Sequence, residues 1–312
     1  MNLLCIGSIA YDSIITPFGK VHKTLGGSAS YFALASKFFA KASLVGIVGN
    51  DFKRTDKKLL EKYADISGIK TAKGKTFHWA GKYHSDLNTR DTLKTELGVF
   101  ANFKPKLNKE HKKANYIFLG NIHPKLQIEV LNQVKSTSQQ TRFVGLDTMN
   151  FWITSAKPDL LKVIKQVNLL CINDSEASEL AGTGDIIKNA NKIYKLMSQK
   201  LNPLLIIKQG ENGLSLFTHN QKNKKLHGFC LPAYKVKKAL DPTGAGDTFA
   251  GALMGYLAKQ NNVSLTNIKK ACEVASIIAS FCVEGFGVAK LDKLKMPDVN
   301  KRLNEYKNTI NY

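Results

Sequence analysis

The sequence lacks the patterns that define several large classes of protein. No apolar run approaches the roughly 18 residues needed to span a membrane, and the N-terminus lacks the basic start and small-residue cleavage site of a signal peptide. The five cysteines stand singly and form no CxxC pair, which argues against a disulfide framework or a zinc site. We therefore expect a cytoplasmic protein with reduced thiols and no membrane partner.

The familiar phosphate-binding and catalytic motifs are missing too. Gly74-Lys75-Thr76 ends like a Walker loop, but Ile69 stands where that loop needs its first glycine. No GxSxG elbow, no protein-kinase HRD set and no HxE with a CxxC pair occurs. If the chain binds phosphates, it must do so with another element.

Arginine is scarce, although the net charge is +22. Only four of the 46 basic residues are arginine, whereas proteins that read nucleic acids depend on its bidentate fork. The lysines are scattered, with short clusters at Lys53-Arg54, Lys57-Lys58, Lys112-Lys113 and Lys222 to Lys225. A solvated lysine-rich surface is therefore the favoured interpretation and a nucleic-acid partner is not expected, while a positive field would help to attract an anionic ligand.

The order of apolar segments indicates one α/β domain over residues 1–312. Short apolar runs alternate with segments of helical spacing, and we found no internal repeat. The predicted strands are 3–9, 43–48, 115–119, 142–147, 168–172 and 204–208, with a hairpin in 213–236. The predicted helices are 31–39, 55–64 with Thr55 as N-cap, 124–135, 159–167, helices inside 174–200, and 244–259 and 265–283. This alternation predicts a mostly parallel central sheet with helices on both faces, which binds ligands beyond the carboxyl ends of its strands.

Two stretches interrupt the alternation, at about 13–25 and 71–103. Both have β-type patterning, and Phe77, Trp79 and Tyr83 recur at even spacing in the second. We interpret them as a small sheet that projects from the core as a lid and excludes water from a site. A surface sheet without a role in binding is the alternative, and an exposed lid edge also suggests a homodimer.

The run from Asp241 to Asp247 carries the strongest chemical signal. Its Gly244 and Gly246 precede an apolar helix of small residues, so backbone amides are expected to point out of a helix N-terminus toward an anion. Asp247 is suited to accept a proton from an attacking hydroxyl as general base. A glycine turn before a capped helix, without catalytic function, is the alternative.

The run resembles the second signature of the ribokinase-like, or PfkB, carbohydrate kinase family. Gly26-Gly27 with the following helix and the segment 46–51 are similar to the first signature, so the resemblance extends along the whole chain in the family's order. It implies a ribokinase-like three-layer fold, ATP and Mg²⁺ as cofactors, Asp247 as catalytic base, and an anion hole of Gly244, Ala245 and Gly246. It also implies that Asp12, Gly26 and Gly27 bind the hydroxyls of the substrate together with Asp247.

Other elements are assigned by the same resemblance. Asn173 and Glu176 match the NxxE element, which holds Mg²⁺ through water, although an Asn helix cap with Glu176 at its third position explains these residues equally well alone. The residues assigned to ATP are Asn173, Lys208, Gly210, Gly213, Thr243, Gly244, Gly246, Ala275, Ile278 and Gly285. Ala275 and Ile278 would serve as core residues of a helix in any case. Asp241 and Thr243 fall where some relatives bind a monovalent cation such as K⁺.

The acceptor is the open question. Tyr31 occupies the position at which sugar kinases of this family often carry an asparagine that contacts substrate, and Asp147 resembles a DxN element without its usual arginine. We expect an ATP-dependent sugar kinase that phosphorylates a hydroxymethyl group. A nucleoside kinase of the adenosine, inosine or cytidine type is the alternative. A non-catalytic nucleotide- or nucleic-acid-binding protein with this fold is the alternative from another class.

Overall fold

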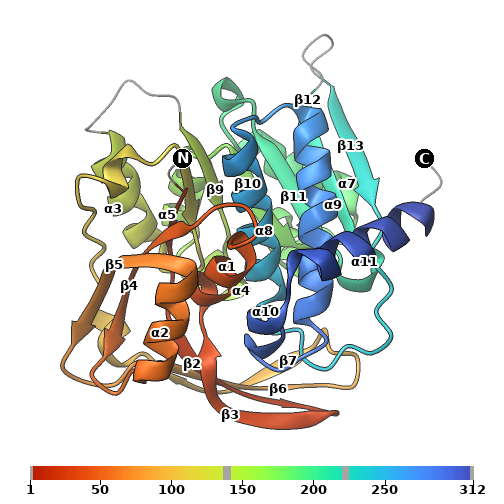
Figure 1. Cartoon of the computed structure of the whole chain (residues 1–312). Coiled ribbons are helices and arrows are strands. Elements are labelled where there is room, and N and C mark those ends of the chain that lie inside the picture. The colour runs from red at the N-terminus through yellow and green to blue at the C-terminus, as the bar shows by residue number, and fades with distance from the viewer. Residues whose placement is uncertain (1–2, 136–141, 220–224, 310–312) are drawn as a thin grey trace. The chain divides into compact units, whose positions relative to one another are not determined.

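The computed structural model describes residues 3–135, 142–219 and 225–309 (Figure 1). The chain divides into two compact units. The first unit contains Met1–Lys106 and Tyr234–Tyr312, and the second contains Leu107–Ala233. The division leaves the prediction of a single kinase domain untested.

Three parallel strands form the core sheet of the first unit. They are β1 (Leu3–Ile6), β4 (Ala42–Gly49) and β5 (Ala64–Ala72), in the order β1-β4-β5. Helices α1 (Ser28–Ser36) and α2 (Arg54–Tyr63) precede β4 and β5, as expected for crossovers between parallel strands. β1 is buried along its whole length, which explains its unbroken apolar sequence.

A separate four-stranded sheet lies in the same unit. Its strands are β2 (Ala10–Thr16), β3 (Gly19–Gly26), β6 (Phe77–Tyr83) and β7 (Arg90–Glu96), in the order β3-β2-β6-β7. The β2-β3 and β6-β7 pairs are antiparallel and β2-β6 is parallel. The predicted small sheet is thus confirmed. Only the start of the predicted stretch 71–103 differs, because Thr71 and Ala72 end β5, which pairs with β4 in the core sheet. The action of the small sheet as a lid stays a prediction.

The C-terminal part of the first unit is helical. Its helices are α8 (Ala245–Gln260), α9 (Leu265–Cys282), α10 (Ala289–Lys293) and α11 (Met296–Thr309). Small residues in α8 allow close packing on α1, because a Cβ added to Gly251 would lie 2.3 Å from the Phe32 carbonyl oxygen.

The second unit continues the alternation of strands and helices. Its strands are β8 (Tyr116–Leu119), β9 (Phe143–Leu146), β10 (Leu169–Asn173), β11 (Leu204–Lys208), β12 (Leu214–His219) and β13 (Leu226–Leu231), in the order β13-β12-β11-β10-β9-β8. Strands β8 to β11 are parallel, and β12 and β13 pair antiparallel at one side. The helices are α3 (Pro124–Lys135), α4 (Asn150–Ser155), α5 (Lys157–Ile164), α6 (Asp174–Ala181) and α7 (Ile186–Leu196). Short 3₁₀ turns occur at His111–Lys113, Gln199–Leu201 and Gly210–Asn212 in this unit and at Gly98–Asn102 in the first unit.

The predicted α/β class with a mostly parallel sheet is confirmed, and one local prediction is wrong. Thr55 does not cap α2, because the helix begins after Lys53, which has no side-chain cap. The Lys53 amide instead donates to the Tyr11 hydroxyl at 2.8 Å, and that hydroxyl donates to Asp56 at 2.9 Å. A tertiary contact from β2 thus replaces the local cap.

The predictions about membrane spans and lysine clusters can be compared with the described residues only. Within the described ranges, no helix is both long and apolar enough to cross a bilayer. Of the predicted lysine clusters, residues 222–224 lie outside the described part of the chain. The cytoplasmic location and the homodimer stay predictions.

Candidate functional site

Asp12 lies on β2, where the Gly26-Gly27 turn encloses it. The Asp12 side chain is buried, and a Cβ on Gly26 would come within 1.9 Å of its Oδ2, so only glycine fits there. Gly27 has a φ of +85° and caps α1. Burial raises the pKa of Asp12 to about 7, while a hydrogen bond from the Gly27 amide opposes the rise. The turn therefore holds a carboxyl group that changes its charge near neutral pH.

Tyr31 on α1 is enclosed near the same acid. Its side chain is 1% exposed, and a Cβ on Gly244 would come within 2.4 Å of three of its ring carbons. Burial raises the pKa of Tyr31 well above its usual value, and the charge of Asp12 adds to the effect. The hydroxyl has no hydrogen-bond partner within the described ranges. A buried polar atom of this kind would be satisfied by a bound polar group or by water.

Asp241 fixes the loop that begins the predicted anion site. The residue is fully buried, its Oδ1 accepts from the Thr243 amide at 2.9 Å, and its Oδ2 accepts from the Gly287 amide at 3.1 Å. Burial raises the pKa of this carboxyl group, and the two amides lower it. Since both oxygens hold backbone amides, the observed role of Asp241 is to shape the loop, and a monovalent cation at Asp241 and Thr243 stays a prediction.

Helix α8 begins where the sequence predicts it. Gly244 is the N-cap with a φ of +75°, so Ala245, Gly246 and Asp247 form the first turn. The Ala245 amide already donates to the Pro242 carbonyl oxygen at 3.2 Å. Asp247 is partly exposed and lies close enough to raise the pKa values of the Cys5 and Cys282 thiols, for which burial is the larger cause. A carboxylate in the first turn of a helix is favoured by the helix dipole.

Replacing Gly244 by alanine tests how tightly this loop is packed. We expect Gly244→Ala to lower the free energy of unfolding by about 2–4 kcal/mol, because an alanine at positive φ costs about 1–2 kcal/mol and Tyr31 must also move. Urea unfolding measures the loss.

Gly182→Ala is the matched control for Gly244→Ala. Gly182 has a φ of +72°, but a Cβ there meets no atom within 4 Å, so only the backbone strain remains. Equal losses in the two variants would contradict the packing of Tyr31 on Gly244.

In the second unit, Asn173 and Glu176 form a reciprocal helix cap. The Asn173 Oδ1 accepts from the Glu176 amide, and the Glu176 Oε2 accepts from the Asn173 amide, both at 2.8 Å. The helix cap that the sequence offered as an alternative is therefore present. It is compatible with the predicted magnesium role, because a carboxylate has two oxygens and about four acceptor positions.

Lys208, Gly210 and Gly213 lie at the turn between β11 and β12. The Gln209 amide donates to the Gly213 carbonyl oxygen at 2.7 Å and closes the turn. Gly213 has a φ of +92°, and a Cβ there would come within 2.0 Å of the Leu231 carbonyl oxygen. Lys208 ends β11 and pairs in register with Asn173 at the end of β10, so the structure brings these two predicted residues together.

Three residues that the sequence assigned to ATP follow α8 in the first unit. Ala275 and Ile278 are 0% exposed in α9, so their observed role is in the helix core. Gly285 follows α9, and a Cβ there would lie 2.9 Å from the Lys290 Cβ. Their roles in nucleotide binding stay predictions.

Sequence reasoning missed two contacts between the small sheet and these loops. The Thr243 hydroxyl donates to the Tyr83 hydroxyl at 3.1 Å, which joins β6 to the anion-site loop. A Cβ on Gly287 would lie 2.8 Å from Thr24 of β3. The even aromatic spacing of β6 identified Tyr83 as a residue of the small sheet but could not reveal its partner.

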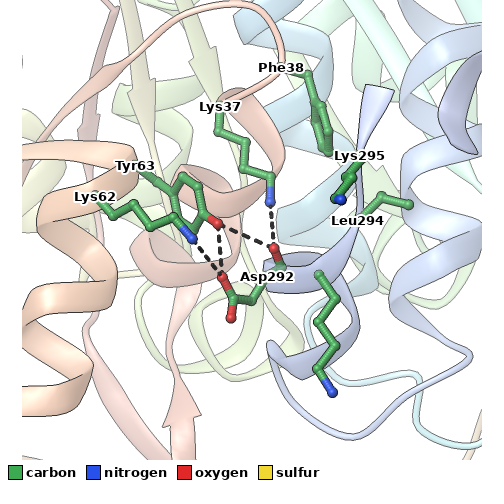
Figure 2. A pocket seen from close by; sticks show the side chains of 8 residues that line it. Lys37, Phe38, Lys62, Tyr63, Asp292, Leu294 and Lys295 are labelled. Carbon is green, nitrogen blue, oxygen red and sulfur yellow. Dashed lines mark hydrogen bonds and ion pairs between the residues drawn. The ribbon is translucent and has the colours of Figure 1, made fainter. Parts of the chain in front are cut away.

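A pocket of about 600 Å³ lies in the first unit, and none of the residues predicted to bind substrate, ATP or metal lines it (Figure 2). The Asp292 carboxylate accepts from the Tyr63 hydroxyl at 2.8 Å, with the Lys62 ammonium 3.7 Å away. The Lys37 ammonium donates to the carbonyl oxygens of Leu291 and Asp292, and burial lowers the pKa of Lys37 to about 8. These contacts connect α1, α2 and α10 and leave the side chains with structural partners. Because the pocket also contains no residue of the predicted site, we do not assign the candidate site to it.

The metal-binding capacity of the described residues is limited. They contain no group of three or more histidine, cysteine or acidic side chains close enough to hold an ion. Of the predicted ligands, Asn173 and Glu176 provide oxygen atoms, which suit Mg²⁺ when water and phosphates complete its shell.

Comparisons with known proteins identify the family of the chain. The chain is 29% identical over 262 residues to the cytidine kinase of Thermococcus kodakarensis, which covers 82% of this chain and 88% of that protein. It is 28% identical over 175 residues to mouse ribokinase, covering 53% and 47% of the two chains. A protein assigned as ribokinase II from E. coli, solved in complex with ATP and Mg²⁺, has a similar fold with a TM-score of 0.76 at 16% identity, covering 97% and 99%. The family model of the pfkB carbohydrate kinases matches residues 2–294, so the chain belongs to this family.

Proposed function

We propose that this kinase transfers the γ-phosphoryl group of ATP to the primary hydroxyl of a nucleoside. The observation that carries the phosphoryl-transfer part is the first turn of α8, where Gly244 caps the helix and Asp247 stands three residues later. Asp12, buried by the Gly26-Gly27 turn in the same unit, provides a second carboxyl group for the hydroxyls of the acceptor.

In this proposal Asp247 takes the proton of the attacking hydroxyl. The hydroxyl oxygen then forms a bond to the γ-phosphorus, the bond to the β-γ bridging oxygen breaks, and ADP leaves. The amides of Gly246 and Asp247 at the start of α8 stabilise the charge that develops on the transferred group. The small sheet, through the Tyr83 contact to Thr243, is suited to order this loop when acceptor is bound.

ATP and Mg²⁺ are the expected cofactors, as the family supports. Bound Mg²⁺ would neutralise phosphate charge, and Asn173 and Glu176 would hold its water shell. Lys208 at the end of β11 would provide a positive charge for the phosphates.

The choice of a nucleoside rests on two observations. The cytidine kinase relative matches across most of both chains, whereas the ribokinase match covers about half of each. Tyr31, in place of the asparagine of sugar kinases, also departs from the sugar-kinase pattern. A free sugar is the second candidate because of the ribokinase relative.

A panel of acceptors tests this proposal. ADP formation from MgATP is measured with cytidine, adenosine, inosine, ribose, fructose and ketodeoxygluconate, and without acceptor as the background. We expect kcat/KM for at least one nucleoside to exceed every sugar by about 100-fold or more, since a site built for one set of polar groups rejects ligands that leave them unpaired. Turnover with sugars alone would establish the second candidate. No turnover with any acceptor, together with salt-sensitive DNA binding, would favour the non-catalytic alternative.

A further inference from the structure

Asp147 and Lys208 form an ion pair that the proposed mechanism does not yet use. Asp147 follows β9, Lys208 ends β11, and Asn173 ends β10 between them. The Lys208 Nζ lies 3.9 Å from the Asp147 Oδ1. Three neighbouring parallel strands of the second unit therefore present a carboxylate, an amide and an ammonium group at their carboxyl ends.

Both members of the pair are largely removed from water. The side chains of Asp147 and Lys208 are 10% and 18% exposed. Burial raises the pKa of Asp147, and the charge of Lys208 lowers it. A buried charge is stable only when an opposite charge or hydrogen bonds compensate it.

The distance between the two charged groups limits how Asp147 interacts with Lys208. A separation of 3.9 Å is short enough for strong charge attraction but too long for a hydrogen bond. The Asp147 Oδ1 meanwhile accepts from the Thr148 amide at 2.9 Å, which fixes the carboxylate to its own loop. Asp147 thus faces the Lys208 ammonium across an ion pair without accepting a hydrogen bond from it.

We propose that Asp147 is a positioning residue that holds the Lys208 ammonium at the carboxyl end of β11, where it binds the phosphates of the nucleotide. The inference rests on the proposed function. Asp147 acts only through Lys208 and does not contact the ligand.

A double-mutant cycle tests this inference by direct binding. Calorimetry measures the affinity of Mg²⁺ with AMP-PNP, a non-hydrolysable ATP analogue, for the full-length protein and for Asp147→Asn, Lys208→Met and the double variant. We expect each single change to weaken binding by about 10- to 100-fold, the loss of one charge-assisted contact. The double variant should bind no more weakly than Lys208→Met. Additive losses, or unchanged binding by Asp147→Asn, would overturn the inference.

A conservative change separates positioning from a structural role. Asp147→Glu retains the charge and should retain most of the affinity, which also guards against misfolding of the asparagine variant. An affinity of Asp147→Glu as low as that of Asp147→Asn would contradict the inference.

Asp159→Asn is the matched control in the same unit. Asp159 pairs with Lys162 at 2.8 Å on α5, and Lys162 is 65% exposed, so this surface pair should leave nucleotide affinity within about twofold. If the unchanged protein fails to bind AMP-PNP, the proposed function and this inference are both wrong. Binding by the unchanged protein with additive losses overturns this inference alone.

Discussion

Asp247→Asn is expected to lower kcat by about 10²- to 10⁴-fold, the usual effect of removing a general base. Asparagine has nearly the same shape and can occupy the same place in the first turn of α8, but it cannot take the proton of the acceptor hydroxyl. Because the helix N-terminus and Lys208 remain, KM for ATP should stay within about twofold. Initial rates with saturating acceptor measure both constants.

The control for Asp247→Asn is another acid at the start of a helix. Asp298 lies in the first turn of α11 and accepts from the Lys295 amide at 3.0 Å, so Asp298→Asn removes an acid of similar local setting that has no proposed role in the reaction. Its kcat should be nearly unchanged. Near-normal turnover of Asp247→Asn would remove Asp247 from the mechanism, whereas a large rise in KM for ATP would show that its charge serves nucleotide binding instead.

The fold was predictable where local sequence and burial agree. Leu204–Lys208 is buried almost throughout, so its unbroken apolar run identifies a strand without any knowledge of its neighbours. β5 was missed because it is only half-buried, and its sequence alternates imperfectly. The start of α2 was wrong because Tyr11, distant in the sequence, supplies the contact that a local cap would have made.

The candidate site was predictable only as a set of loops. Gly244 could be identified because a close approach of the backbone to another group requires glycine, and Gly26 through its resemblance to the first family signature. A Cβ at either position would collide with a neighbouring side chain. The resemblance assigned Asp12 and Tyr31 to the substrate, but it could not show that Asp12 packs against Gly26 or that Tyr31 packs against Gly244. The Asp147–Lys208 pair was equally hidden, because a long stretch of chain and another strand separate its members.

Asp12→Asn is expected to stabilise the protein while it removes most of its activity. The pKa of Asp12 is raised to about 7 in the folded chain, against an ordinary value of 3.8, because the carboxyl group is buried. Between about pH 4 and pH 7, Asp12 is therefore protonated in the folded state and ionised in the unfolded state. The free energy of unfolding thus falls as pH rises through this range. Asparagine carries no charge to bury, and at pH 8 the gain should be about 2–4 kcal/mol. At pH 4 the gain should vanish.

The catalytic consequence of Asp12→Asn has the opposite sign. In the proposed function, ionised Asp12 would accept hydrogen bonds from the acceptor hydroxyls, so KM for the acceptor should fall in the unchanged protein as pH rises through 7. In Asp12→Asn that dependence should disappear and kcat/KM should drop by about 100-fold or more, because an amide can accept fewer hydroxyls than a carboxylate. Asp91→Asn, which removes an exposed carboxylate of the same small sheet that pairs with His84 at 2.9 Å, should change neither property. If the gain of Asp12→Asn over the unchanged protein is no larger at pH 8 than at pH 4, burial of the Asp12 charge does not destabilise the fold. If the variant retains its activity, the acceptor is bound elsewhere.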